Sequence, residues 1–266
     1  MGLLRSCIVL CLALGSVAVA AQTHQPRPMQ IQSSYAVQAE ARQIVELANQ
    51  ARARAGAGPL KWDAALAAAA RRHCMRMAEE GVISHQYADE EEISERAARA
   101  GAHFSVIEEN VAVAPDPVSI HEAWMRSAGH RRNLLNPQVD HVGVAVVAGR
   151  HGLYAVADYS HAVPVLTQAE VESAVAGLVR ASGITILRDA TLARAACAED
   201  AGLPHPASGA RPRFVMRWQN GELNELPEDL TESLASGKYA RAAVGSCPTQ
   251  GVEDNFTAYR VAVLLY

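Results

Sequence analysis

Histidine is the residue type that most strongly suggests chemistry in this chain of 266 residues. Eight of the ten histidines lie between residues 73 and 161, and the segment after Pro164 contains only His205. Neutral imidazole is a common metal ligand and a general acid or base near neutral pH. We therefore expect any metal or acid–base site to belong to the part of the chain that precedes Pro164.

Three short strings in that part contain the residues best suited to form a site. They are Ser84-His85, Glu108-Glu109-Asn110-Val111, and the run from Trp124 to Pro137 that includes Ser127, His130 and Asn133. His85 and His130 are candidate nitrogen ligands for a divalent ion such as zinc, at about 2.0–2.1 Å. Glu109 would orient one imidazole by accepting its second ring N–H, or bind a metal-bound water.

Two histidine ligands are fewer than the four that a structural zinc uses, so an ion here would be weakly held and partly hydrated. The alternative is that His85 and His130 only make hydrogen bonds that close a polar groove, with Glu109 satisfying them. Under either interpretation we expect the three side chains to converge in one cleft, although 24 and 21 residues separate them along the chain.

A hydrolase would need a nucleophile beside a base, and two serines lie near the histidines. Ser84 adjoins His85, but adjacency in sequence does not position a nucleophile on a base. Ser127 precedes His130 by three residues, with Gly129 between them, and no Gly-x-Ser-x-Gly string is present. No catalytic residue is assigned. A binding module is favoured over a metal-dependent hydrolase or a ligand-free extracellular structural module.

The elements that must position these residues are expected to be helices first and paired strands last. Apolar spacing and capping residues predict helices with these bounds: a first ending near Gly56 and Gly58, a second from Asp63 to Gly81, a third over Ser94–Ala100 and a fourth over Pro117–Ser127. Alternating residues predict two strands, 141–147 and 153–159, joined by a Gly-Arg-His-Gly turn. This layout is α+β, with helices flanking an antiparallel sheet.

In their order and spacing, the three strings resemble the CAP superfamily of cysteine-rich secretory, antigen 5 and pathogenesis-related 1 proteins, especially its bacterial SCP-like extracellular members. The resemblance extends over about Ala36 to Ala162. It implies a three-layer α-β-α sandwich with an antiparallel sheet, and a central groove that contains two histidines and two acidic groups. Such a groove would bind an ion, a small lipid or a peptide.

The resemblance assigns His85, Glu109 and His130 to three of the four groove positions. Ser127 stands where eukaryotic relatives have a second glutamate, and Glu108 replaces the usual glycine before the Glu-Asn pair. We assign structural roles to Trp124, Asn110 and Asn133. Trp124 is expected to pack the fourth helix onto the sheet, and Asn133 to fix the loop after His130.

Two other groups of polar residues are better explained by structure than by function. His73 lies on the apolar face of the second helix, which favours a hydrogen-bonded core histidine. The run Asp89-Glu90-Glu91-Glu92 lacks the spacing of a calcium loop and is expected to form a solvated face.

The N-terminus and the composition indicate where the protein acts. Residues 1–20 have one cation, an apolar run and a final Ala-Val-Ala, which is typical of a cleaved signal peptide, an uncleaved anchor being the alternative. A flexible lead of residues 21–35 would follow. We thus expect a secreted, periplasmic or extracellular protein without stable membrane insertion. A net charge of −4 and only 13 aromatic residues disfavour nucleic-acid binding. Oligomeric state is not predicted.

Residues 165–266 are expected to form a second, smaller α+β unit after a domain spanning 36–163. Shifted by 126 positions, residues 45–70 match 171–196 at eleven places, six of them alanine. A degenerate internal repeat is one explanation, and two unrelated alanine-rich helix pairs is the other. Cys197 and Cys247 are the expected disulfide because both lie in this unit, whereas Cys74 follows His73 in the second helix.

Overall fold

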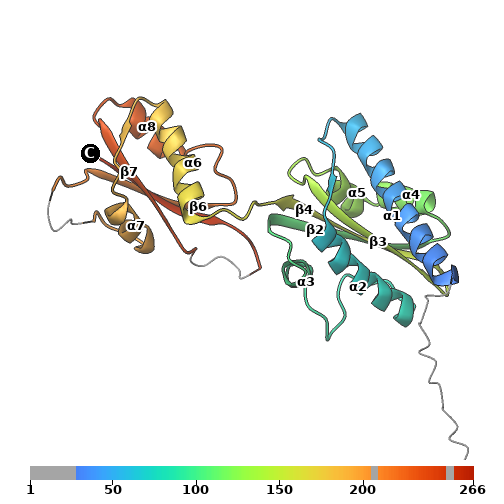
Figure 1. Ribbon diagram of the computed structural model, residues 1–266. Helices are drawn as coiled ribbons and strands as arrows, with labels where there is room; N and C mark the ends of the chain where they lie inside the picture. The colour runs from blue at the N-terminus through green and yellow to red at the C-terminus, as the bar shows by residue number, and fades with distance from the viewer. Residues whose placement is uncertain (1–27, 205–208, 250–254) are drawn as a thin grey trace, which may run out of the picture.

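The computed structural model describes residues 28–204, 209–249 and 255–266 (Figure 1), so the expected signal peptide lies outside the described residues. Its strands form two four-stranded sheets, one on each side of Pro164. The α+β class is confirmed, and so is a smaller unit after the first. Among the described residues, no helix combines the length and apolarity that crossing a bilayer requires.

Helix α1 (Pro28–Ala55) is longer than expected. It begins inside the segment 21–35 that was assigned to a flexible lead, so that assignment is wrong from Pro28 onward. Proline suits the first turn of a helix because its missing N–H has no partner there in any case. From Ala41 onward, alanine and isoleucine at helical spacing turn one buried face toward the sheet. Gly56, with φ of 75°, follows the last turn.

Helices α2 (Ala64–Glu80) and α3 (Ile93–Arg99) end where expected. Asp63 caps α2 by accepting hydrogen bonds from the amides of Ala65 and Leu66, and Gly81 ends it in the left-handed conformation. Gly101, with φ of 93°, follows α3. The loop between these helices contains His85, so both helix ends are anchor points for the site.

The first sheet has the strand order β1 (Lys61–Trp62), β3 (His141–Gly149), β4 (Gly152–Ala162) and β2 (Phe104–Ala114). β3 and β4 pair as the predicted antiparallel hairpin, and β2 adds antiparallel to β4. β1 runs parallel to β3, so the sheet is mixed and the expectation of an antiparallel sheet is wrong at this edge. Parallel strands need a long crossover connection, and here α2, α3 and β2 all lie between β1 and β3 in the chain.

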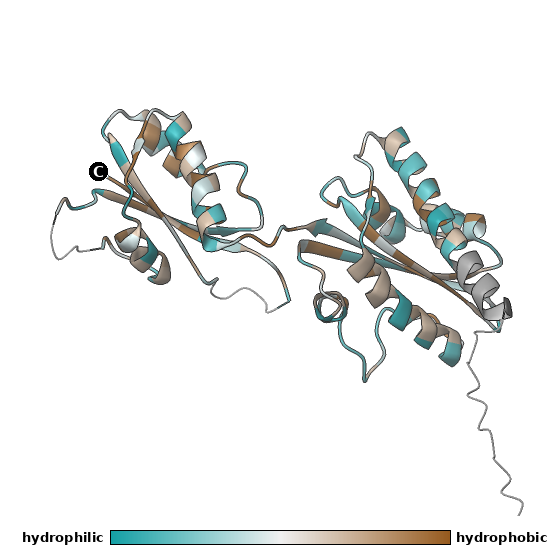
Figure 2. Ribbon diagram, in the orientation of Figure 1, coloured by the Kyte–Doolittle hydropathy of each residue, from teal (hydrophilic) through white to brown (hydrophobic). Residues whose placement is uncertain are grey.

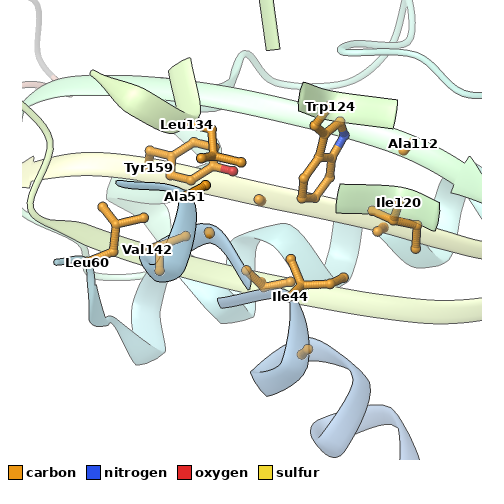
Figure 3. Close-up of a cluster of buried hydrophobic side chains, with 14 of the residues drawn as sticks. Ile44, Ala51, Leu60, Ala112, Ile120, Trp124, Leu134, Val142 and Tyr159 are labelled. Carbon is orange, nitrogen blue, oxygen red and sulfur yellow. The ribbon is translucent and has the colours of Figure 1, made fainter. Parts of the chain in front are cut away.

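Helices cover both faces of this sheet, which confirms the three-layer sandwich. Apolar residues of α1, α4 (Pro117–Arg126) and α5 (Ala128–Leu135) pack on one face, with Ile44, Trp124 and Leu134 among them (Figure 3). Helix α2 packs on the other face. Strands covered on both faces are apolar along most of their length, as the brown strands in Figure 2 show.

Strand β2 and helix α5 were not predicted. The charged pair Glu108-Glu109 interrupts the apolar alternation of β2, which conceals a strand from a pattern search. The expected fourth helix over Pro117–Ser127 is two helices: Ser127 has an extended backbone (φ −84°, ψ 123°) that ends α4 and begins α5. Asn133 was expected to fix a loop after His130. It lies instead within helix α5.

A buried arginine holds α5 against α1. The Arg52 guanidinium is 1% exposed and donates hydrogen bonds to the carbonyls of Leu134 (2.9 Å), Asn136 (2.9 Å), Val139 (2.8 Å) and Gly58 (2.6 Å). The bonds to Leu134 and Asn136 satisfy carbonyls at the C-terminal end of α5, where a helix has no partners of its own. Burial lowers the pKa of Arg52. The contact fixes the helix that bears His130.

The second unit has the same order of elements as the first, with fewer helices in its middle. Its elements are α6 (Gln168–Ala181), β5 (Thr185–Ile186), α7 (Thr191–Ala198), β6 (Phe214–Asn220), α8 (Glu228–Ala235), β7 (Arg241–Cys247) and β8 (Tyr259–Leu265). The strand order β5-β7-β8-β6, with β5 parallel to β7, corresponds to β1-β3-β4-β2. Common descent by duplication remains a prediction.

A disulfide joins Cys197 on α7 to Cys247 at the end of β7, and Cys74 is a buried free thiol. The second unit also contacts the first. Phe256 packs edge-on against Phe104, with ring centroids 5.2 Å apart, and the Thr257 amide donates a hydrogen bond of 2.8 Å to the Phe104 carbonyl. These contacts lie at the start of β2, the strand that contains Glu109.

Candidate functional site

The structure brings His85, Glu109 and His130 together at β2, the edge strand of the first sheet. His85 lies in the α2–α3 loop on one side of the sheet, and His130 lies on α5 on the other side. Glu109 projects from the strand between them. The ring centroids of the two histidines are 6.1 Å apart, and His85 Nδ1 lies 2.8 Å from Glu109 Oε1.

The three side chains differ strongly in exposure. The His85 side chain is 58% exposed, whereas that of Glu109 is 4% exposed. His130 is partly buried, and its ring has no hydrogen-bond partner among the described residues. Two ring nitrogens are therefore available to bind a ligand. One is Nε2 of His85, since Nδ1 of the same ring is bonded to Glu109, and the other is a nitrogen of His130.

Arg96 is a member of the site that sequence reasoning missed. Its guanidinium is 3% exposed, and Nη2 lies 2.5 Å from Glu109 Oε2. Nη1 donates to the carbonyls of His85 (3.2 Å) and Glu91 (3.0 Å). Arg96 thus neutralises Glu109 and fixes the loop that contains His85. Arg96 and Arg99 lie on the same short helix, and the sequence does not show which of them is buried. Only the face of the helix on which each lies distinguishes them.

The three residues assigned to structural support all bind near the strand. Trp124 Nε1 donates to the Val111 carbonyl (3.1 Å), and Asn133 Nδ2 donates to the Glu109 carbonyl (3.1 Å). Asn110 Nδ2 donates to the His130 carbonyl (2.9 Å). Because β2 is an edge strand, its outer backbone groups have no neighbouring strand, and α4 and α5 supply partners instead.

A buried His73–Glu90 pair fixes the loop from the other end. His73 is fully buried in α2, with Nδ1 2.7 Å from Glu90 Oε1 and Nε2 2.7 Å from the Ser84 carbonyl. The prediction of a hydrogen-bonded core histidine is confirmed. The prediction that Asp89–Glu92 is a solvated face is wrong at Glu90, whose side chain is only 12% exposed, because a buried imidazole needs a partner.

Hydrogen bonding and burial move the two histidine pKa values in opposite directions. The hydrogen bond that His85 donates to Glu109 raises the pKa of His85 above its ordinary value, against the opposing effect of burial. Burial, with the nearby charge of His85, lowers the pKa of His130. His130 therefore loses its proton at a lower pH than His85 does, and becomes available as a ligand first as pH rises.

The serines do not form a nucleophile–base pair in the described structure. Ser84 Oγ donates to the Gln86 carbonyl (2.6 Å), within its own turn. Ser127 begins α5, and no hydrogen bond joins its side chain to the ring of His130 among the described residues. Glu108 faces the opposite side of the sheet from Glu109 and accepts a hydrogen bond from Asn136 Nδ2 (3.1 Å).

The donor set fits a divalent ion only as a partly hydrated one. Rings 6.1 Å apart can hold one ion between them at Zn–N distances of about 2.0–2.1 Å. A carboxylate on the second nitrogen of a ligating histidine, as Glu109 provides for His85, is the usual outer partner. Among the described residues, however, no group of three or more His, Cys, Asp or Glu side chains is arranged to hold a metal.

Comparison with known proteins shows what the first unit is similar to. Residues 45–159 match the model of the CAP cysteine-rich secretory protein family. Two uncharacterized proteins of Bacillus subtilis are each 33% identical: YkwD over 112 residues (42% of this chain, 44% of YkwD) and the membrane protein YlbC over 107 residues (40% and 31%). The chain therefore spans less than half the length of either relative.

Solved structures of similar proteins include two from bacteria. An extracellular protein containing an SCP domain from Bacillus anthracis has a TM-score of 0.45 and 27% identity, over 52% of this chain and 45% of that one. A cysteine-rich secretory protein from Staphylococcus aureus has a TM-score of 0.40 and 24% identity, over 47% and 39%.

Proposed function

We propose that the chain binds a divalent ion such as zinc at the edge of β2, through His85 and His130, in the part that matches the CAP family model over residues 45–159. The observation that carries this proposal is the approach of two imidazoles from opposite layers to a ring separation of 6.1 Å, with Glu109 bonded to Nδ1 of one of them. The remaining coordination positions would be filled by water or by an organic ligand.

The site is proposed to act outside the cytoplasm, in a secreted or periplasmic protein, as the N-terminal pattern of residues 1–20 indicates. A binding role is favoured over catalysis because the serines near the histidines are not paired with them in the described structure. Val82 and Ile83, which are 59% and 45% exposed, precede His85 on the same loop. Their exposure favours an apolar part in any lipid or peptide ligand that joins the ion.

Zinc affinity should fall on acidification, and first through His85. Ligation requires neutral imidazole, and the raised pKa of His85 places its protonation above the ordinary value of about 6.5. His130, with its lowered pKa, protonates only at more acidic pH. We expect isothermal titration calorimetry to show one zinc per chain at pH 7.5, and an affinity at least about tenfold weaker at pH 5.5.

The matched variants are the double substitution His85→Ala/His130→Ala and, as control, His141→Ala/His151→Ala. The first should abolish zinc uptake, and the second should leave it unchanged, because His141 and His151 lie outside the site, at the start of β3 and in the β3–β4 turn. Equal uptake by both double variants would place any ion elsewhere and overturn the proposal.

A further inference from the structure

Asp158 is a buried carboxyl group that the site described so far does not use. It lies on β4, directly opposite Glu109 on β2 and Gly143 on β3. Cross-strand partners project from the same face of a sheet, so Asp158 and Glu109 point toward the same layer, that of α2 and α3. Asp158 is 0% exposed, and neither of its carboxyl oxygens receives a hydrogen bond from any described donor.

No ion pair joins Asp158 to a cation among the described residues. The ionisable groups that influence it are Glu109 from β2, Arg96 from α3 and Arg72 from α2. Arg96 is paired with Glu109 at 2.5 Å, and Arg72 is an exposed residue whose Nη2 donates to the Arg96 carbonyl. The thiol of Cys74, also on α2, stays neutral because burial raises its pKa to about 12.

An ionised Asp158 would therefore be a second buried carboxylate with no cation of its own. Burying an unpaired charge is costly, and a carboxyl group in that position keeps its proton instead. A protonated Asp158 carries an O–H donor, which itself needs an acceptor. The Glu109 carboxylate lies within hydrogen-bonding reach of it.

We infer that Asp158 is held as the neutral acid of a carboxyl pair and donates its proton in a hydrogen bond to Glu109, so that the pair has one negative charge, located on the carboxylate that contacts His85. Asp158 is then a positioning residue: it does not touch a ligand, but it fixes which carboxylate is charged. Burial and the neighbouring charge of Glu109 raise the pKa of Asp158 well above its ordinary value, which agrees with this assignment.

The consequence concerns His85. Glu109 accepts hydrogen bonds from Arg96 and His85, and the inferred bond from Asp158 adds a third donor that fixes the orientation of its carboxylate. The inference rests on the proposed function only for its purpose, which is that the charged Glu109 holds His85 in place as a metal ligand. Its test follows the protonation of His85 without any metal ion present. The inference about Asp158 and the proposal of zinc binding can therefore fail separately.

The test is the titration of the His85 imidazole by nuclear magnetic resonance in the full-length protein and in Asp158→Asn. Asparagine is neutral, similar in shape and able to donate to Glu109, so it mimics the protonated acid. We expect the His85 midpoint to change by less than about 0.2 pH units, because no charge is lost. Glu109→Gln is the positive control and should lower that midpoint, since the Glu109 hydrogen bond raises the pKa of His85.

A fall of about half a unit or more in Asp158→Asn would show that Asp158 is ionised and would overturn the inference. The pH dependence of the free energy of unfolding gives a second readout, and its direction is fixed by the inference. The folded wild type keeps a proton that the unfolded chain releases above pH of about 3.9, so it loses stability as pH rises. The unfolding constant of wild type relative to Asp158→Asn should rise about a thousandfold between pH 3 and pH 7, since each pH unit above the unfolded pKa of about 3.9 contributes about tenfold.

If Asp158→Asn does not fold, the wild type alone decides the question. The ¹³C chemical shift of the Asp158 carboxyl carbon should be that of a protonated acid at pH 7. A shift typical of a carboxylate at that pH would contradict the inference.

Discussion

Replacing Arg96 with methionine should lower the free energy of unfolding by about 3–5 kcal/mol, because it leaves Glu109 as a buried carboxylate without a cation. Arg96 is 3% exposed and bonds Glu109 at 2.5 Å. It also donates to the carbonyls of His85 and Glu91, so the substitution frees the loop that contains His85. Urea denaturation at pH 7 measures the change.

Arg99→Met is the matched control on the same helix. Arg99 is 63% exposed and pairs with Glu91 and Glu95 at the surface, where an ion pair stabilises by only about 0–1 kcal/mol. We expect its unfolding midpoint to stay close to that of the wild type. If both variants lost the same small amount of stability, Arg96 would not be the buried counterion of Glu109.

Removing the disulfide should have an effect of similar size, confined to the second unit. Cys197 and Cys247 are 50 residues apart, and closing a loop of that length stabilises by roughly 3–4 kcal/mol in the chain-entropy model. We expect Cys197→Ser/Cys247→Ser to lower the unfolding free energy by about that amount. The imidazole signals of His85 and His130 should not move.

Peptide mapping without reduction checks the pairing itself. The bridged peptide should contain Cys197 and Cys247, and Cys74 should be alkylated only after unfolding, because it is buried in α2. A bridge that included Cys74 would contradict the structure and would link the two units covalently.

The sequence predicts much of the first unit because its signals are local. Asp63 and Gly81 bound α2 through a cap and a left-handed turn, and both depend only on nearby residues. The β3–β4 hairpin is likewise indicated by alternation around a glycine-containing turn. The candidate site residues His85, Glu109 and His130 were found from ordered strings, not from geometry.

The remaining features depend on tertiary contacts. β2 was missed because Glu109 and Asn110 are polar, and their burial depends on Arg96 and α5. Asp158 was missed for a related reason: one polar residue in an alternating strand suggests a solvent face, but helices cover both faces of this sheet. The separate helix α5 depends on the extended backbone of Ser127, for which the sequence has no strong signal.

The most direct test of the central claim follows all imidazole signals by long-range ¹H–¹⁵N correlation while zinc is added at pH 7.5. We expect the signals of His85 and His130 to change together, and the change to be complete at one equivalent of zinc. The signals of His73, which is buried with both nitrogens occupied, and of His151 in the β3–β4 turn should stay in place. Changes confined to other histidines, or His85 and His130 responding at different zinc concentrations, would contradict a shared site.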